Sequence, residues 1–374
     1  MLTLSVLAVA QAGGCRAVAP AASGPLIPMP VGEPAASGSA DVLRGVGVEP
    51  KTIHPADGQK AVIRYDLPEP ARVTLDLVDA DGRIARRIDA GDLPAGVQET
   101  VWDGRMNAGE WAPPGVYRYV ISIQTHDGHT RVQDASAVTG GEELNARAFT
   151  YDDTSGHLRW VMPKAGYARL RIGIQGFPHL RTLLDWQPLE AGEHTLDWDG
   201  MDASGLIALK DHPKRLIKLN VFSMPENTVI VDGTPSGAVV PGPAAYASDQ
   251  KPAGSYLHAR HGRSRCGEVP FSVDFLVPGL RRDAEGRPLL PAAAVPVRVT
   301  LDPAHAARAV NGRFEVSLYE DLNFLFEEEN GSQPFTFEWK TEGLTPGVHL
   351  LTVNLMTYDD HYGVVTVPVS IEHP

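Results

Sequence analysis

Residues 256–271, which read YLHARHGRSRCGEVPF, hold the side chains best suited to chemistry in this sequence. His258, His261 and Cys266 are of the residue types that bind soft metal ions. They supply three ligands without a fourth, and the paired cysteines of a structural zinc site are missing. We therefore interpret the segment first as a basic strand or loop, with metal or redox chemistry at Cys266 as an alternative. We expect no cofactor.

An acidic segment complements this basic one. Residues 318–339 read LYEDLNFLFEEENGSQPFTFEW, and their first part predicts a short helix or a strand that runs into an acidic turn. If the two segments meet inside one domain, which we favour, Arg–Glu pairs stabilise its fold. If they face outward, they are docking surfaces that steer partners. The candidate docking residues are His258, Arg260, His261, Arg263, Arg265, Glu327, Glu328 and Glu329.

Two aspartates stand in a motif that occurs twice, VWDGRMNAG (101–109) and DWDGMDASG (197–205). A catalytic aspartate needs a partner base, acid or metal that shifts its pKa, and no histidine or second carboxylate recurs beside both copies. The motif instead predicts a turn, in which Asp accepts backbone hydrogen bonds, Gly adopts a positive φ and Trp packs on the core. The predicted turn residues are Trp102, Asp103, Gly104, Gly109, Trp198, Asp199, Gly200 and Gly205.

The two motifs belong to a longer duplication. Residues 93–109 align without gaps with residues 189–205, so that Trp198 follows Trp102 by 96 residues. Apolar and polar residues alternate upstream of both motifs, which predicts half-buried β-strands. A repeat of this length fits a β-sandwich of the immunoglobulin (Ig) type. The upstream matches are Pro68 with Pro163 and, after an inserted residue, Ala71-Arg72 with Ala168-Arg169.

The first copy resembles the Ig-like domain of the flagellar hook-capping protein family, over residues 52–125. The resemblance implies an Ig-like fold and not hook capping, because the hook-assembly segment of that family has no counterpart here. The second copy keeps the turn but lacks the PGVY segment, so we read it as a diverged copy. The elements that carry the resemblance are Asp81-Gly82-Arg83, Leu93, Ala95-Gly96, Trp102-Asp103-Gly104, Gly109 and Pro114-Gly115-Val116-Tyr117.

The whole chain predicts an all-β architecture. Gly (37) and Pro (31) are plentiful among the 374 residues, which disfavours long helices. We predict tandem Ig-like β-sandwiches, two duplicated units and a third, diverged C-terminal one, after a disordered tether. The predicted segments are a lipoprotein-type signal peptide (1–14), a flexible tether (15–50), Ig-like domain 1 (51–128), Ig-like domain 2 (145–228), a linker (229–255) and a C-terminal Ig-like domain 3 (256–374).

The N-terminal residues MLTLSVLAVAQAGGC are apolar, then small, and end in Cys15. They resemble the lipobox of bacterial lipoproteins, in which the cysteine becomes the diacylated N-terminus. The resemblance implies lipidation of Cys15, and Arg16 after it favours the outer membrane over retention in the inner one. Cys266 is then the only free thiol, so the mature chain cannot form an internal disulfide.

The net charge of −13 argues against a nucleic-acid partner, which would need a basic face. Nucleophile elbows, P-loops and Gly-x-Gly-x-x-Gly motifs after strands are absent from the sequence. We therefore predict a non-enzymatic, lipid-anchored structural or adaptor protein of the cell envelope or an extracellular assembly. Its Ig-like domains would act as spacers and would dock protein partners, and a small-molecule substrate is not expected.

Two further alternatives depend on exposed side chains. A carbohydrate-binding or adhesive surface protein would need a row of exposed aromatic residues. The Asp-rich turns at 79–82, 151–153 and 358–363 contain oxygen ligands that calcium prefers, above all between domains, but ordinary turn chemistry also accounts for them. The aromatic candidates for the adhesive alternative are Trp111, Trp160, Trp186 and Trp339.

Overall fold

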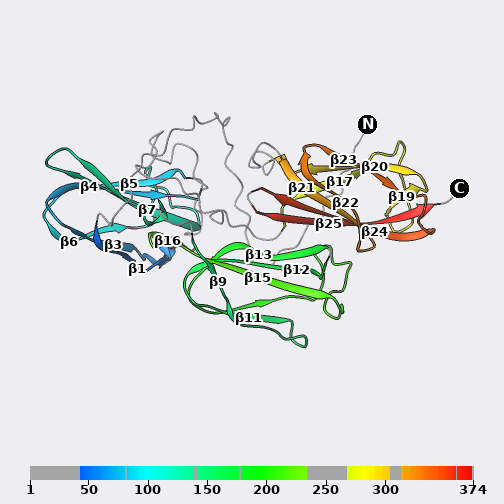
Figure 1. Cartoon of the computed structure of the whole chain (residues 1–374), viewed down its shortest axis with the longest axis horizontal. Helices are drawn as coiled ribbons and strands as arrows, with labels where there is room; N and C mark the ends of the chain where they lie inside the picture. The colour runs from blue at the N-terminus through cyan, green and yellow to red at the C-terminus, as the bar shows by residue number, and fades with distance from the viewer. Residues whose placement is uncertain are drawn as a thin grey trace.

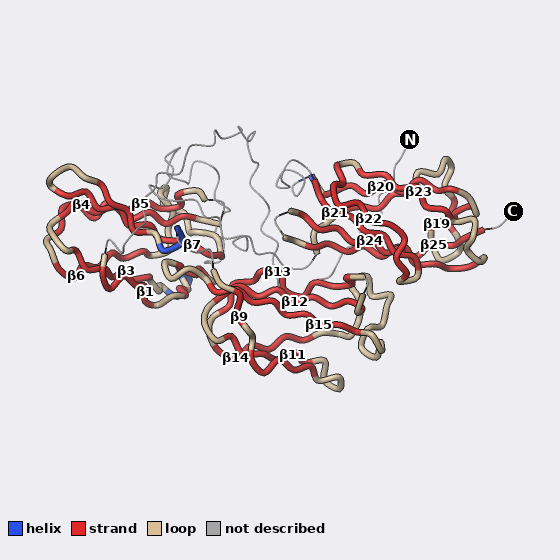
Figure 2. The backbone as a smooth tube through the Cα atoms, viewed as in Figure 1, coloured by secondary structure: helices blue, strands red, loops and turns tan. Residues whose placement is uncertain are grey.

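The structure is a computed structural model, and it describes residues 43–80, 82–137, 141–176, 178–233, 268–303, 313–358 and 360–372. Within these ranges the chain is mostly β-strand, with two short 3-10 helices, η1 (Pro55–Asp57) and η2 (Ala135–Ala137) (Figure 2). The strands form three bodies, drawn in blue to cyan, in green and in yellow to red in Figure 1. Each body has a hydrophobic core of its own.

The first body, called unit 1 here, is a sandwich of two sheets. One sheet has the strand order β1-β3-β6, and the other has the order β2-β16-β7-β4-β5, with β8 also paired to β7. Alternation decides which side chains enter the core, since Ile63 and Tyr65 are buried whereas Arg64 between them is exposed. The strands are β1 (Arg44–Glu49), β2 (Thr52–Ile53), β3 (Ala61–Leu67), β4 (Ala71–Val78), β5 (Ile84–Leu93), β6 (Gly96–Trp102), β7 (Gly115–Thr125), β8 (Thr130–Gln133) and β16 (Thr228–Val231).

Two predicted boundaries of unit 1 differ from the structure. Strand β1 pairs with β3, so residues 44–49, placed in the tether by the sequence, belong to the sandwich. Strand β16 pairs antiparallel with β7 and parallel with β2, although the sequence placed Thr228 at the end of domain 2 and residues 229–231 at the start of the linker. The run Thr228–Val231 lies between β2 and β7 in the sheet, and its four residues are buried there. Unit 2 is thus inserted between two strands of unit 1.

Unit 2 repeats the strand pairing of unit 1. Its sheets have the orders β10-β11-β14 and β13-β12-β15-β9. The first corresponds to β1-β3-β6 and the strands β13-β12-β15 correspond to β5-β4-β7, while β9 pairs with β15 at the positions where β8 pairs with β7. Because these strands pair in the same way in both units, the duplication seen in the sequence is a duplication of the fold. The strands are β9 (Glu143–Leu144), β10 (Arg147–Tyr151), β11 (His157–Met162), β12 (Gly166–Ile174), β13 (His179–Leu189), β14 (Gly192–Asp197) and β15 (Arg215–Ser223).

The register corrects one detail of the sequence alignment. Ala71 lies between Leu93 and Thr125 in unit 1, and Gly166 lies in the same way between Leu189 and Ser223 in unit 2. Gly166 is therefore the counterpart of Ala71, and the predicted match with Ala168 is wrong. Ala168 occupies the place of Val73 instead. The inserted residue of unit 2 falls within β13, at Leu183, where the pairing with β12 jumps from Leu184 to Thr182.

Unit 3 is the third sandwich that the sequence predicted. A sheet of order β17-β20-β23 packs on one of order β18-β19-β25-β24-β21-β22. The last two strands form a hairpin around the Asp-rich turn at 358–363. The strands are β17 (Phe271–Phe275), β18 (Arg281–Arg282), β19 (Pro288–Pro291), β20 (Ala294–Leu301), β21 (Arg313–Glu320), β22 (Asn323–Ser332), β23 (Phe335–Lys340), β24 (Gly347–Thr357) and β25 (Tyr362–Glu372).

Candidate functional site: turns and junctions of the three units

The Trp-Asp-Gly motif of unit 1 follows β6 and forms a closed turn. The buried indole of Trp102 donates through Nε1 to the carbonyl of Arg105 at 2.8 Å. The Oδ1 of Asp103 accepts the backbone N–H of the same Arg105 at 3.1 Å, which is an Asx turn. Gly104 has a φ of 81°, and a Cβ there would lie 2.7 Å from Cγ of Pro55. Only glycine fits this position.

The motif of unit 2 makes the same contacts. Trp198 Nε1 donates to the carbonyl of Met201 at 2.8 Å, and Asp199 Oδ1 accepts the N–H of Met201 at 3.0 Å. Gly200 has a φ of 80°, and its Cβ would lie 2.8 Å from Cβ of Lys210. The closing glycines Gly109 and Gly205 also have positive φ, at 98° and 72°. These interactions account for the spacing of Trp, Asp and Gly that both copies of the motif share, and they require no chemistry at either aspartate.

The predicted docking residues divide into two groups. His258, Arg260, His261, Arg263, Arg265 and Cys266, like Cys15, lie outside the described residues. Glu327, Glu328 and Glu329 lie on β22, the edge strand of the larger sheet of unit 3, so the segment is a strand and not a helix. Glu327 and Glu329 are exposed. The register of β21 and β22 places Glu315 close to these carboxylates. Burial, and then the nearby charge of Glu327, raise the pKa of the Glu315 carboxyl.

Three of the four tryptophans considered for carbohydrate binding are buried in cores or between units. Trp160, Trp186 and Trp339 have exposed fractions of 3%, 0% and 1%. Trp111 is half-buried under the guanidinium of Arg105, which lies 3.7 Å from its ring centre. The four rings therefore present no exposed row of aromatic surface.

Aspartates of the three Asp-rich turns considered for calcium bond to other groups of the protein. Asp79 pairs with Arg83 in its own turn, and Asp152 accepts the N–H of Thr154. Asp360 pairs with Arg169 of unit 2. Within the described ranges, His, Cys, Asp and Glu form no group of three or more that could hold a metal ion.

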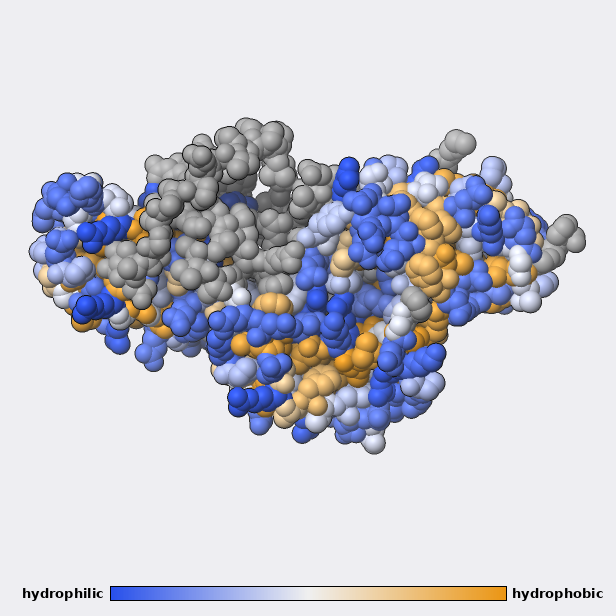
Figure 3. All heavy atoms as spheres, viewed as in Figure 1, coloured by the Kyte–Doolittle hydropathy of each residue, from blue (hydrophilic) through white to orange (hydrophobic). Residues whose placement is uncertain are grey.

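The junction of units 1 and 2 has an apolar cluster of its own. Val116 and Ile230 of unit 1 pack there against Tyr167, Trp186 and Met224 of unit 2, and all five side chains are buried. Since Ile230 belongs to β16, the strand that completes the sheet of unit 1 also supplies its contact with unit 2. On the face drawn in Figure 3, apolar side chains gather over unit 2, whereas the outer end of unit 1 is mostly hydrophilic.

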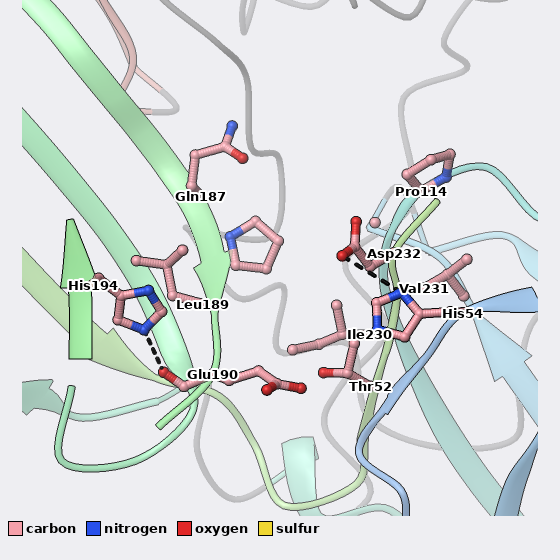
Figure 4. A pocket seen from close by; sticks show the side chains of 12 residues that line it. Thr52, His54, Pro114, Gln187, Leu189, Glu190, His194, Ile230, Val231 and Asp232 are labelled. Carbon is pink, nitrogen blue, oxygen red and sulfur yellow. Dashed lines mark hydrogen bonds and ion pairs between the residues drawn. The ribbon is translucent and has the colours of Figure 1, made fainter. Parts of the chain in front are cut away.

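A cleft of about 380 Å³ lies beside this cluster, between units 1 and 2 (Figure 4). On one wall His54 Nδ1 lies 3.7 Å from Oδ2 of Asp232. On the other wall the Nε2 of His194 bonds the carbonyl of Glu190 at 2.9 Å, and the Glu190 carboxylate reaches towards Thr52 across the cleft. Among the described residues, none of those that line the cleft is a cysteine or a serine. Sequence reasoning missed these residues, because they come from segments that are distant along the chain.

The junction of units 2 and 3 is polar and deeply buried. Asp185 and His361 are both fully buried, and Oδ2 of Asp185 lies 2.6 Å from Nδ1 of His361. Arg169 Nη1 lies 2.7 Å from Oδ1 of Asp360, whose carbonyl accepts the indole N–H of Trp186 at 3.1 Å. Trp186 thus contacts all three units. A buried charge that loses its partner destabilises the fold, because it is removed from water and left uncompensated.

Further contacts extend this junction along β13. The backbone N–H of His179 donates to Oδ1 of Asn354 at 2.9 Å, and the Nδ2 of Asn354 donates back to the His179 carbonyl at 2.7 Å. The guanidinium of Arg171 stacks 3.8 Å from the ring centre of Tyr362. Burial, and then the like charge of Arg169, lower the pKa of Arg171. These contacts join β12 and β13 of unit 2 to β24 and β25 of unit 3.

The paired sheets of the three units define an all-β protein of tandem Ig-like sandwiches. Residues 51–127 match the family model described as the FlgD Ig-like domain. The chain is 38% identical over 68 residues to the basal-body rod modification protein FlgD of Salmonella typhimurium, and 33% identical over 88 residues to that of Escherichia coli strain K12. These matches cover 18% and 24% of this chain and 28% and 32% of the relatives, so the chain spans less than a third of their length.

Solved structures show the same kind of similarity. FlgD from P. aeruginosa shares 27% identity with a TM-score of 0.21, covering 25% of this chain and 73% of that one. The fibronectin(III)-like modules of CbhA from Clostridium thermocellum share 9% identity with a TM-score of 0.20, covering 88% and 94%. The predicted resemblance of unit 1 to the FlgD Ig-like domain is confirmed. Among the described residues, no helix is long and apolar enough to cross a membrane.

Proposed function

We propose that this protein is a non-enzymatic spacer and adaptor of the cell envelope or of an extracellular assembly. The observation that carries the proposal is the junction at Trp186, which is 0% exposed and contacts all three units. Linked sandwiches that merely tether one another have small, polar contacts and move independently. A buried aromatic side chain and buried ion pairs instead favour one fixed geometry, and a fixed geometry is what a spacer requires.

Protein docking is the second part of the proposal. The exposed carboxylates Glu327 and Glu329 on an edge strand offer an acidic surface, and charged surfaces of this kind steer association and select partners. The match of unit 1 to a domain of FlgD, a basal-body rod modification protein, supports a role within an assembly. The basic segment of residues 256–267 would be the complementary surface, either within unit 3 or for a partner.

A lipid anchor at Cys15 is the third part, and it would place the protein on the outer membrane. Two lipid chains on one cysteine suffice for stable membrane attachment, whereas one chain binds only reversibly. Mass spectrometry of the mature N-terminus should find acylated Cys15. An unmodified N-terminus elsewhere in the chain would overturn this part and leave the docking proposal standing.

The docking proposal is tested by cross-linking and pull-down of the full-length protein from its envelope fraction. The wild type should capture a defined partner, and a variant with Glu327→Gln and Glu329→Gln should lose most of it. A matched variant, Glu193→Gln, removes an exposed carboxylate from unit 2 and should retain capture. Equal capture by all three proteins, or no capture by the wild type, would contradict the assignment.

The other two functions find less support. An adhesive carbohydrate-binding protein would need exposed aromatic rings, and Trp160, Trp186 and Trp339 are buried. Metal or redox chemistry would rest on His258, His261 and Cys266. Metal analysis of the purified protein beside a Cys266→Ala variant tests that alternative directly.

A further inference from the structure

We infer that strands β2 and β16 form a mechanical clamp that keeps unit 2 out of the path of tension along the chain. The inference rests on the proposed function, because an anchored spacer is pulled from its two ends. Tension from an N-terminal anchor enters unit 1 through β1 and β2, and it leaves unit 1 through β16 towards unit 3. The two strands at which force enters and leaves are hydrogen-bonded neighbours.

The pairing between these two strands is parallel. Thr52 lies opposite Ile230, and Ile53 lies opposite Val231. The N–H of Ile230 donates to the carbonyl of Lys51 at 2.8 Å, and the N–H of Asp232 donates to the carbonyl of Ile53 at 3.0 Å. Force draws β2 towards its N-terminal end and β16 towards its C-terminal end. Parallel strands pulled in this way slide past each other, so their hydrogen bonds are loaded together and do not open one at a time.

Strand β16 is also fixed on its other side. It pairs antiparallel with β7 from Thr228 to Val231, and its side chains are buried in the core of unit 1 and at the junction with unit 2. At its start, the Nδ2 of Asn227 donates to the carbonyl of Tyr119 and to Oδ1 of Asp134, each at 2.8 Å. Sliding β16 therefore requires the simultaneous loss of two ladders and of buried apolar contacts.

Because unit 2 is inserted between two strands of unit 1, the clamp decides whether tension along the chain passes through unit 2. The chain leaves unit 1 after β8, forms unit 2 from β9 to β15, and returns as β16. The β2–β16 pair closes this long loop, so force passes from β2 to β16 without crossing unit 2. While the clamp holds, unit 2 is not pulled apart through its own two ends.

Single-molecule force spectroscopy on the full-length chain tests the inference. One handle is attached at the N-terminus and the other at Thr234→Cys, just after β16, in a background with Cys15→Ser and Cys266→Ser. If the clamp is correct, unit 2 does not unfold before unit 1. Unfolding of unit 2 alone would add roughly 80 residues at about 3.4 Å each, or roughly 270 Å, whereas unit 1 has roughly 95 residues of its own and would add roughly 320 Å. A first step of the shorter length would overturn the inference. Release of the 6-residue β1 is far too short to be confused with it.

Two variants of Asp232 isolate the clamp bonds. Asp232→Pro removes the N–H that β2 accepts, while the side chain that is lost is 69% exposed. It should lower the first rupture force. Asp232→Ala keeps the N–H and should leave that force unchanged. Equal forces for wild type and Asp232→Pro would contradict the assignment.

A third variant covers the case in which Asp232→Pro does not fold. Trp198→Phe weakens the turn of unit 2 by removing an indole hydrogen bond, and it leaves β2 and β16 intact. The first rupture force should stay at the wild-type value, and a clear decrease would place unit 2 in the force path. These outcomes do not depend on finding a partner, so they are distinguishable from failure of the pull-down.

Discussion

Units 1 and 2 share the pairing of their main strands, and they use a β-bulge in equivalent strands differently. In β5 the pairing jumps from Gly91 to Asp89 and leaves Ala90 unpaired; in β13 it jumps from Gln187 to Leu184. Counting from the shared Leu93 and Leu189, Asp185 and Trp186 stand where unit 1 has Asp89 and Ala90.

The side chains at this bulge therefore lie on the surface in unit 1 and in a buried junction in unit 2. Asp89 pairs with Arg72 on the surface, where both side chains are about half exposed. Asp185 is buried against His361 of unit 3, and Trp186 takes a φ of 51° that directs its ring into the junction. Bulges re-aim side chains, and positive φ in a non-glycine residue marks a position that the surroundings determine. Duplication preserved the scaffold, and replacement of side chains at one bulge made a junction from a surface.

The largest expected effect comes from removing the aromatic ring at this junction. Trp186→Ala should lower the free energy of unfolding by about 3–5 kcal/mol, because a fully buried ring leaves a cavity. The measurement is denaturant unfolding followed by fluorescence and circular dichroism. Trp111→Ala removes a half-buried ring from unit 1 and should cost clearly less; equal losses would contradict the special place of Trp186.

Removing the equivalent aspartates compares the bulges directly. Asp185→Ala leaves His361 buried without its carboxylate and should cost about 3 kcal/mol. Asp89→Ala removes one side of an exposed pair and should change stability little, since solvent screens such pairs. Chemical denaturation of the two variants in parallel provides the test. A loss in Asp89→Ala as large as that in Asp185→Ala would show that burial is not the cause.

The two Trp-Asp-Gly turns should respond alike, because this is where the copies have not diverged. Gly104→Ala and Gly200→Ala each impose a positive φ on alanine and a Cβ contact below 3.0 Å, so each should cost about 1–3 kcal/mol. Gly47→Ala is the control, since its Cβ would meet nothing within 4 Å. Thermal unfolding of the three variants measures the effect, and a cost in one turn only would break the equivalence.

The smallest effect concerns the acidic edge of unit 3. Burial, and then the charge of Glu327, raise the pKa of Glu315 above its usual 4.5 in the folded state. The folded protein therefore holds this proton more tightly than the unfolded chain, and it loses stability as pH rises through the raised pKa. Glu315→Gln should be slightly more stable than wild type at neutral pH and should lose this pH dependence. Unfolding curves between pH 4 and pH 8 would show it, and a variant less stable than wild type at pH 7 would contradict the prediction.

Strands, turns and the duplication could be predicted from the sequence because each depends on neighbouring residues. The alternation of Ala61, Ile63 and Tyr65 with polar residues predicts a strand and its buried face. The Asp-Gly pairs predict turns, because each Asp side chain accepts a hydrogen bond from the backbone N–H two residues further on. The residues at the start of the acidic segment allowed a helix or a strand. Pairing of β21 and β22 around Asp321 and Leu322, both at positive φ, decided for a hairpin.

The sequence by itself thus determined which segments are strands, which residues turn, and that one unit is a copy of the other. Only the tertiary structure decided what each buried face meets. Asp185 finds its partner 176 residues away, and Asn227 bonds a carbonyl 108 residues away. A mostly apolar run such as Thr228–Val231 predicts that these residues will be buried. It does not predict which part of the molecule covers them, because hydrophobic burial is non-directional. Its place between β2 and β7 is set by pairing with strands that lie far earlier in the chain.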